Sequence, residues 1–271
     1  GIIPPEIGNL TNLIKLNLSS NQFSGSIPSE IGNLTNLTSL NLSSNQFSGD
    51  IPIEIFNLLN LEGGIEPALM GTVFYPGLDL SDNSLSGIIG EQIASFEKIR
   101  SIDLSYNQLT GSLPSGLYNL DSLRSLNLSN NSLTGEISAE IGNLSSLEGI
   151  TTYAHNSVTQ YDALNLSNNS LTGIIPSEIC DLPLDWGDSY MNEYQGFSIS
   201  NNQFCSPFPY CLEGFIGSQD TSNCVQMKNQ FAETVPNIYS LLQNHPNPFN
   251  PITSLRYDLP SDGLVNITIY D

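Results

Sequence analysis

Basic residues are scarce in this sequence: six Lys and Arg stand against 27 Asp and Glu among 271 residues, which gives a formal net charge of −21. A field of this sign repels phosphate backbones, so we expect no nucleic-acid partner. Long apolar runs are also missing, and none approaches the roughly 20 residues that a membrane-spanning helix needs. The sequence therefore predicts no transmembrane segment.

Cysteine is absent from the first 179 residues, and all four cysteines fall between positions 180 and 224. No Cys-x-x-Cys pair occurs, and both histidines, His155 and His245, lie outside this stretch. This spacing disfavours zinc, which usually takes such pairs or adjacent histidines. A local disulfide framework is the favoured interpretation, and it indicates an oxidising compartment.

Catalytic motifs are missing as well. The chain has no Gly-x-Ser-x-Gly turn, and no pair of carboxylates stands out from the acidic background. His155 has no evident partner nucleophile in the sequence. We therefore expect neither enzyme activity nor a cofactor.

A 24-residue unit recurs along the chain, in full at 13–36, 37–60, 99–122 and 123–146, with degenerate copies further along. Each copy carries Leu-x-x-Leu-x-Leu-x-x-Asn-x-Leu/Phe, then Gly and often Ile-Pro. The x-Leu-x-Leu-x core alternates, so it predicts a short strand with Leu inward and Asn or Ser outward. Because one coil cannot bury its apolar face alone, stacked coils should form a solenoid.

This pattern resembles the plant-type leucine-rich repeats, and its Ser-Gly-x-Ile-Pro and Gly-Asn-Leu segments carry the resemblance over residues 1–204. The resemblance implies an α/β-type right-handed solenoid with a parallel concave β-sheet and short 3-10 or irregular convex segments. It also implies a non-catalytic role, since such proteins mostly bind proteins, peptides or glycans on the concave sheet or its rims.

One asparagine recurs in every coil, at Asn21, Asn45, Asn83, Asn107, Asn131, Asn169 and Asn202. We interpret this ladder as structural, because an inward amide can satisfy backbone groups that the bend leaves unpaired.

The outward strand positions hold mostly Asn, Asp and Ser, and only Arg100, Tyr106 and Arg124 interrupt this small polar surface. Protein hot spots favour larger anchors, so the concave face alone does not indicate one tight protein ligand. A regular surface of this kind also suits a polysaccharide or an ice lattice, and a repeat without a selected ligand is equally open. Asp79, Asp82 and Asp103 could offer oxygens to calcium, but hydrated surface carboxylates are the favoured interpretation, so we expect no metal.

Two gaps in the ladder are longer than 24 residues: Asn45 to Asn83 and Asn131 to Asn169 each span 38 residues, 14 more than the repeat. The insertions, at 62–77 and 148–163, each follow a Leu-Glu-Gly start, which indicates duplication of a three-coil block. We expect both to project from one rim, three strand spacings or roughly 14 Å apart. Their candidate ligand-binding residues are Phe74, Tyr75, Tyr153, His155, Tyr161 and Asp162. The alternative is that these aromatic residues pack down over the edge of the core.

The repeat fails after Asn202, and residues 180–224 are interpreted as a C-terminal cap over the last coils. Four cysteines allow three pairings. Stacking in register favours Cys180 with Cys211, which leaves Cys205 with Cys224.

Residues 225–240 are interpreted as a linker, and a different composition follows it. The run Asn-His-Pro-Asn-Pro-Phe-Asn-Pro at 244–251 and the alternating runs at 255–259 and 265–269 resemble the start of a bacterial type IX secretion sorting domain over 241–271. The alternation predicts the first strands of a partial β-sandwich. The resemblance implies a bacterial host, transient contact with secretion machinery, and continuation of the domain beyond Asp271, with poor order after about residue 244.

The chain begins inside a repeat, so we expect further repeats and any export signal to precede Gly1. These features together predict a secreted or cell-surface recognition module that binds an extracellular protein or glycan. The alternatives are a structural or adhesive spacer without a specific ligand, and binding of ice or a polysaccharide lattice.

Overall fold

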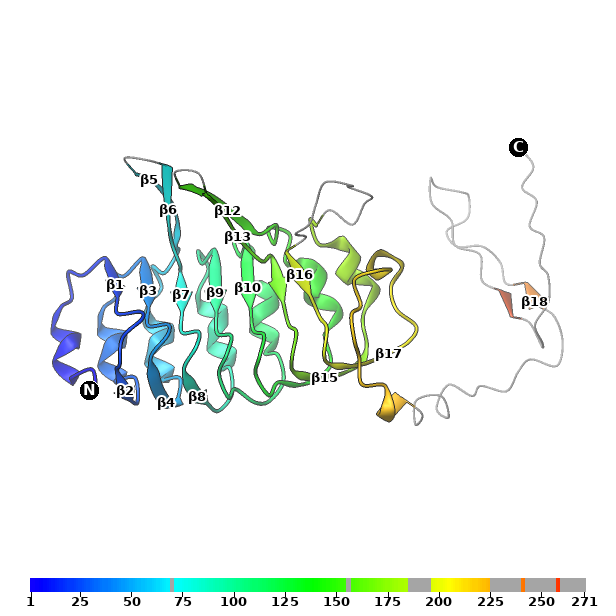
Figure 1. The fold of residues 1–271 in the computed structure, drawn as a ribbon, viewed down its shortest axis with the longest axis horizontal. Helices are drawn as coiled ribbons and strands as arrows, with labels where there is room; N and C mark the ends of the chain where they lie inside the picture. The colour runs from blue at the N-terminus through cyan, green and yellow to red at the C-terminus, as the bar shows by residue number, and fades with distance from the viewer. Residues whose placement is uncertain (69–70, 155–156, 185–195, 225–239, 242–256, 259–271) are drawn as a thin grey trace. The chain divides into compact units, whose positions relative to one another are not determined.

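The computed structural model describes residues 1–68, 71–154, 157–184, 196–224, 240–241 and 257–258 (Figure 1). The chain divides into two units, Gly1–Ser222 and Asn223–Asp271. In the second unit, β18 (Ser240–Leu241) pairs antiparallel with β19 (Tyr257–Asp258). The predicted linker and most of the predicted sorting domain lie outside the described residues.

The first unit is a solenoid whose concave face is one parallel sheet of seven short strands, each from a successive coil (Figure 1). In spatial order they are β1 (Lys15–Asn17), β3 (Ser39–Asn41), β7 (Leu78–Asp79), β9 (Ser101–Asp103), β10 (Ser125–Asn127), β14 (Leu164–Asn165) and β16 (Phe197–Ser198). Equivalent residues pair across neighbouring strands, as in Leu40 with Leu78. The predicted leucine-rich-repeat solenoid with a parallel concave sheet is confirmed.

The core follows from the alternation of the repeat. Leu40, Leu42 and Leu126 are fully buried, while the intervening Asn41 and Asn127 are only partly buried on the concave face. Phe47, Phe96 and other large side chains from each coil complete one continuous apolar column. Each buried leucine contributes about 2 kcal/mol, so stability grows with the number of stacked coils.

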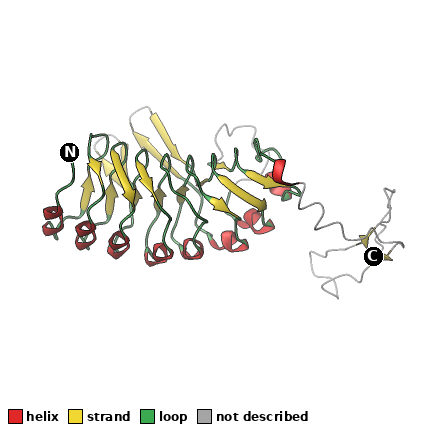
Figure 2. Cartoon of the chain, turned by 90° about the horizontal axis from the view of Figure 1, so that it is seen from below, coloured by secondary structure: helices red, strands yellow, loops and turns green. Residues whose placement is uncertain are grey.

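The convex side consists of short 3-10 helices, one per coil (Figure 2). They are η1 (Pro5–Asn9), η2 (Ser29–Asn33), η3 (Ile53–Asn57), η4 (Glu91–Ser95), η5 (Ser115–Asn119), η6 (Ala139–Asn143), η7 (Ser177–Asp181) and η8 (Tyr210–Leu212), with η9 (Ser222–Cys224) near the end of the first unit. Proline precedes several of them, as Pro28 does η2, and its fixed φ sets the extended entry into the helix. None of the described helices is long and apolar enough to span a membrane.

The glycine of the Ile-Gly-Asn-Leu segments lets these helices stack closely. A Cβ on Gly32 would lie 2.3 Å from the carbonyl oxygen of Glu54 in the next coil. A larger residue would therefore push the coils apart, which explains why the repeat specifies glycine here.

Two short parallel sheets are formed by residues that follow the concave strand in each coil. One contains β2 (Ser24–Gly25), β4 (Gln46–Asp50) and β8 (Ser84–Ser86); the other contains β11 (Thr134–Gly135), β15 (Ser170–Ile174) and β17 (Gln203–Cys205). A single bridge between Ile88 and Thr110 lies between them.

The asparagine ladder joins each coil to the one before it. Asn107 Nδ2 donates to the carbonyl oxygens of Leu80, Leu104 and Ser105, and its Oδ1 accepts from the amide of Leu85. Asn107 is buried, so these bonds satisfy backbone groups that water does not reach.

The residue before each ladder asparagine has a left-handed backbone, with φ between 53° and 56°. Asparagine tolerates this conformation and is found at Asn130, Asn168 and Asn201. Tyrosine tolerates it poorly, so Tyr106, with a φ of 53°, has a strained backbone. The described non-glycine residues with a left-handed backbone therefore all lie at the position before the ladder asparagine.

The C-terminal end is closed by cystines and by an extra ladder rung. Cys180 is disulfide-bonded to Cys211, as predicted, and Cys205 and Cys224 are also disulfide-bonded. Beyond Asn202, Gln219 donates to the carbonyl oxygens of Ile199 and Ile216, and it accepts from the amide of Phe204. Gln219 therefore repeats the bonding of the asparagines one step further along.

Candidate functional site

The two insertions form β-hairpins that join above one rim of the concave sheet (Figure 1). The first contains β5 (Gly64–Ala68) and β6 (Gly71–Tyr75), and the second contains β12 (Ile150–Ala154) and β13 (Ser157–Tyr161). They combine in one antiparallel sheet of order β13-β12-β6-β5, with Ala154 opposite Gly71. We call this four-stranded sheet the arch.

The arch corrects the expectation of two separate projections. Both hairpins do rise from the same rim, because each precedes the concave strand of its coil, β7 or β14. Three strand spacings separate their bases, yet the hairpins converge instead of standing apart. The inner edges of the two hairpins meet at the pair of Gly71 with Ala154.

Two aromatic rings close the gap between the bases of the hairpins. The ring centroids of Phe74 and Tyr161 are 4.4 Å apart at an interplanar angle of 42°. Both side chains are half-buried, and each comes from a different hairpin. The pair therefore ties the arch together where it approaches the concave sheet.

Two carboxylates of the concave sheet lie close to this aromatic pair. Asp79 and Asp103 are opposite each other on β7 and β9. Burial raises the pKa of Asp79, and burial together with repulsion from Asp79 raises the pKa of Asp103 to about 6. Burial, and then the negative charge of Asp79, raise the pKa of the Tyr161 phenol. Asp79 and Tyr161 are thus electrostatic neighbours in a partly dehydrated site.

The outward Asn and Asp side chains already hold hydrogen bonds within their own coil. Ser105 donates its amide and its hydroxyl to Asp103 Oδ1, and Ser43 bonds Asn41 in the same way. Either Asn or Asp can serve as this acceptor, which explains their exchange along the column. The regular polar surface therefore contributes to the turn after each strand.

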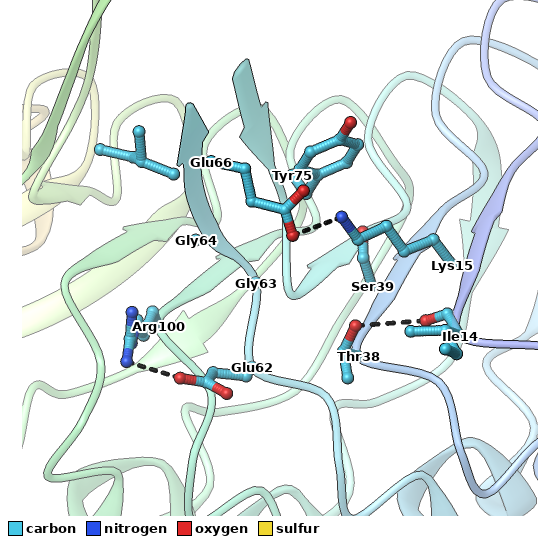
Figure 3. Close-up of a pocket in the computed structure, with 11 residues that line it drawn as sticks. Ile14, Lys15, Thr38, Ser39, Glu62, Gly63, Gly64, Glu66, Tyr75 and Arg100 are labelled. Carbon is cyan, nitrogen blue, oxygen red and sulfur yellow. Dashed lines mark hydrogen bonds and ion pairs between the residues drawn. The ribbon is translucent and has the colours of Figure 1, made fainter. Parts of the chain in front are cut away.

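A cavity of about 390 Å³ lies at the foot of the first hairpin, and we call it the rim notch (Figure 3). It is lined by Ile14, Lys15, Thr38, Ser39, residues 62–66, Tyr75 and Arg100. Lys15 Nζ is 2.5 Å from Glu66 Oε1 and 3.5 Å from the centroid of the Tyr75 ring. The volume of the rim notch is within the usual range for small-ligand sites, and both acidic and basic side chains line it.

Two further ion pairs lie along the same rim, between the hairpin bases. Arg100 pairs with Glu62, and Arg124 pairs with Glu148, where the two glutamates belong to the Leu-Glu-Gly starts of the insertions. All four side chains are substantially exposed, so each pair adds little stability. These groups instead define a charged border beneath the arch.

The remaining predicted residues take different places. Tyr106 is 60% exposed at the other end of its strand, beyond the turn, and lies away from the arch. Tyr153 is on β12 opposite Val158. Asp162 directly follows β13 and accepts from Asn165 Nδ2 and, through its carbonyl oxygen, from Ser125. His155 lies outside the described residues.

Sequence reasoning missed Lys15 and the Asp79–Asp103 pair as parts of a site near the hairpins. Lys15 is one of only six Lys and Arg residues, and this scarcity is the sequence feature that could have drawn attention to it. The sequence favours hydrated surface carboxylates for the aspartates, with calcium ligation as the alternative, and neither interpretation connects them with the hairpins. Among the described residues, no three His, Cys, Asp or Glu side chains gather closely enough to hold a metal ion.

Leucine-rich-repeat family models match three parts of the chain, at residues 11–60, 77–135 and 163–182. No match was found among curated protein sequences.

Solved plant receptors share the fold. The plant peptide hormone receptor RGFR1, in complex with RGF2, is 30% identical with a TM-score of 0.63, and the match covers 81% of this chain and 30% of the receptor chain. The Arabidopsis receptor kinase HAESA, in complex with the peptide hormone IDA and the co-receptor SERK1, is 32% identical with a TM-score of 0.60. That match also covers 81% of this chain and 30% of the other.

This chain therefore spans about 30% of the length of each of these two receptor chains. The repeat, the buried leucine column, the parallel sheet and these similarities agree on one assignment. The chain is a leucine-rich-repeat solenoid, similar to the ectodomains of plant peptide receptors.

Proposed function

We propose that this chain is an extracellular, non-catalytic recognition module that binds an extended segment of another protein on the concave surface beneath the arch. The observation that carries this proposal is the joining of two distant hairpins over the sheet through Phe74 and Tyr161. The arch stands beside the concave surface along three strand spacings, so a ligand lying along the sheet could contact both.

The similar plant receptors support a peptide rather than a glycan. RGFR1 is a plant peptide hormone receptor in complex with RGF2, and HAESA is in complex with the peptide hormone IDA. The match covers only part of each receptor, so the likeness supports the class of ligand and not its identity.

The charge supports a basic segment. The chain carries a formal net charge of −21, and Asp79 and Asp103 lie together near the aromatic pair. A lysine or arginine beside these carboxylates would relieve their mutual repulsion, and an aromatic ring nearby adds a cation–π contact.

A spacer without a ligand is the alternative, and the internally bonded Asn, Asp and Ser columns favour it. An ice or polysaccharide lattice would have to use these same columns, whose acceptors already serve Ser43 and Ser105. The arch favours recognition over both alternatives, because neither requires it.

We also propose secretion. The disulfides support an oxidising compartment. The sequence run at 244–251 supports a bacterial type IX sorting domain. A reporter protein fused to residues 241–271 tests this proposal, because a working sorting domain should export the reporter.

The experiment is a peptide and glycan array probed with the full chain and with an arch-less variant. Deleting 62–75 and 148–161 removes 14 residues from each insertion and leaves Leu61-Pro76-Gly77-Leu78 and Leu147-Asp162-Ala163-Leu164. Both junctions restore the Leu-x-x-Leu spacing, so the solenoid should remain folded.

We expect basic peptides to bind the full chain and not the arch-less variant. An exposed control, Ile53→Ala on the convex side, should bind as the full chain does. Unchanged binding by the arch-less variant would reject the proposal, and absence of all binding would favour the spacer.

A further inference from the structure

The four-stranded sheet of the arch ends in two different edges. β5 is one edge, and it contains Pro67 and the ion-paired Glu66. Proline and charge are the residues that commonly protect a sheet edge against further strands. β13 is the other edge, and its sequence Ser-Val-Thr-Gln-Tyr contains neither proline nor charge.

The duplication shows what an edge of the β13 kind accepts. Residues 61–78 align with 147–164 without a gap, so β6 and β13 hold equivalent places in the two hairpins. The registers agree, since Gly64 faces Tyr75 as Ile150 faces Tyr161. The outer edge of β6 meets β12 at one antiparallel pair, Gly71 with Ala154, whereas β13 ends the sheet among the described residues.

The backbone of β13 presents hydrogen-bonding groups on this edge. Ala154 and Ser157 flank a two-residue connection, and such flanking residues exchange both backbone hydrogen bonds. The pattern then alternates, so Val158 and Gln160 direct their N–H and C=O groups away from β12. Equivalent positions on β6 are Thr72 and Phe74, on the side where β12 lies.

We propose that the β13 edge docks an extended peptide strand of a partner protein, which adds antiparallel to Val158–Tyr161 and extends the arch to five strands. Recognition by strand addition draws its affinity from the main-chain hydrogen bonds. This edge is the side of β13 that faces away from β12, so it is a separate surface from the concave sheet.

The partner is a neutral or basic strand from another protein, not a second copy of this chain. Each copy carries a net charge of −21, so two copies repel one another. The other available edge, β5, lacks the Pro67 amide as a donor, which disfavours head-to-tail pairing of β5 with β13.

The experiment measures amide hydrogen exchange in the full chain with a capped probe peptide. The probe has the sequence of residues 149–154, which includes β12, the strand that meets the equivalent edge of β6, and it is flanked by two lysines at each end. At saturating peptide, exchange at the amides of Val158 and Gln160 should slow at least tenfold. The same peptide N-methylated at alternate amides, on its pairing edge, should give no protection.

Two variants separate the backbone edge from the side chain. Gln160→Pro removes one outward donor and should weaken binding at least tenfold, while Gln160→Ala should bind as the unmodified chain does. Should Gln160→Pro unfold the arch, the N-methylated peptide still decides. The proposal is overturned if these amides are already protected in the free chain, if the N-methylated peptide protects equally, or if sedimentation shows that the chain pairs with itself through this edge.

Discussion

Phe74 and Tyr161 lie on hairpins from two different coils, yet their rings are 4.4 Å apart. Together with the pair of Gly71 and Ala154, this contact links two coils that are not neighbours in the stack. Burial, and then the negative charge of Asp79, raise the pKa of the Tyr161 phenol. The base of the second hairpin is therefore electrostatically coupled to Asp79 on the concave sheet.

Replacing Phe74 with Ala should loosen the arch without melting the solenoid. The ring pair contributes about 0.5–1.5 kcal/mol beyond its buried area. We expect faster hydrogen exchange in β5, β6, β12 and β13, with unchanged exchange in β9 and β10. The matched control is Val73→Ala, whose side chain is exposed on the neighbouring position. Equal effects of the two substitutions would show that the ring contact does not hold the hairpins together.

The contribution of Asp103 to stability should fall as pH rises from about 4 to 6. The folded state raises the pKa of Asp103 to about 6 from 3.8, so the folded chain binds more protons than the unfolded chain in this window. Bound protons therefore favour folding below the window, and this contribution is lost as pH rises through it.

The Asp103→Asn variant should lose this slope and gain about 1–2 kcal/mol at pH 7. Asn already serves at the equivalent position in Asn127, where it accepts from Ser129. Urea unfolding from pH 4 to 8 measures the difference, with the exposed Asp82→Asn as the control that keeps the slope. A parallel pH profile for Asp103→Asn would contradict the assignment.

The ladder asparagine Asn107 should be among the most costly residues to truncate. Its substitution by Ala leaves three carbonyl groups and the Leu85 amide without this partner in a buried site. We expect a loss of about 3 kcal/mol or more in the free energy of unfolding. Asn21→Ala in the first coil should cost less, because Asn21 is exposed and its amide donates to Leu18 and Ser19 of its own turn. Similar losses for the two variants would argue against the ladder as a link between coils.

Tyr106 is strained, so a better residue should stabilise the chain. Its φ of 53° is left-handed, and Asn occupies the equivalent position at Asn130, Asn168 and Asn201. We expect Tyr106→Asn to add about 0.5–1 kcal/mol in thermal or urea unfolding. The reverse change, Asn130→Tyr, should destabilise by a similar amount. A destabilised Tyr106→Asn would mean that the exposed ring makes a contact that outweighs the backbone strain.

The periodic part of the fold follows from the sequence, because local alternation fixes the inward leucines and the spacing fixes the coils. Leu40 and Leu78 pair as their positions in the repeat require, even with an insertion between them. The longer spacing between Asn45 and Asn83, and between Asn131 and Asn169, likewise locates the two insertions. Cys180 and Cys211 were paired correctly because the coils stack in register.

The arch did not follow from the sequence, for physical reasons. Gly64–Ala68 contains Gly, Glu and Pro, which are poor strand residues, and its strand forms only by pairing with β6. The contact of Gly71 with Ala154 depends on how the hairpins lean over the curved sheet, which no local pattern encodes. The raised pKa of Asp103 follows from burial and from its register with Asp79, and repeat alignment alone predicts only the register.

The most direct test of recognition beneath the arch is the affinity of the best basic peptide from the array for the unmodified chain and for the Phe74→Ala/Tyr161→Ala double variant. Titration calorimetry at one salt concentration measures both. The account predicts at least a tenfold weaker affinity for the double variant, with the leucine-rich solenoid still folded. Equal affinities would contradict it and would place the ligand elsewhere on the chain.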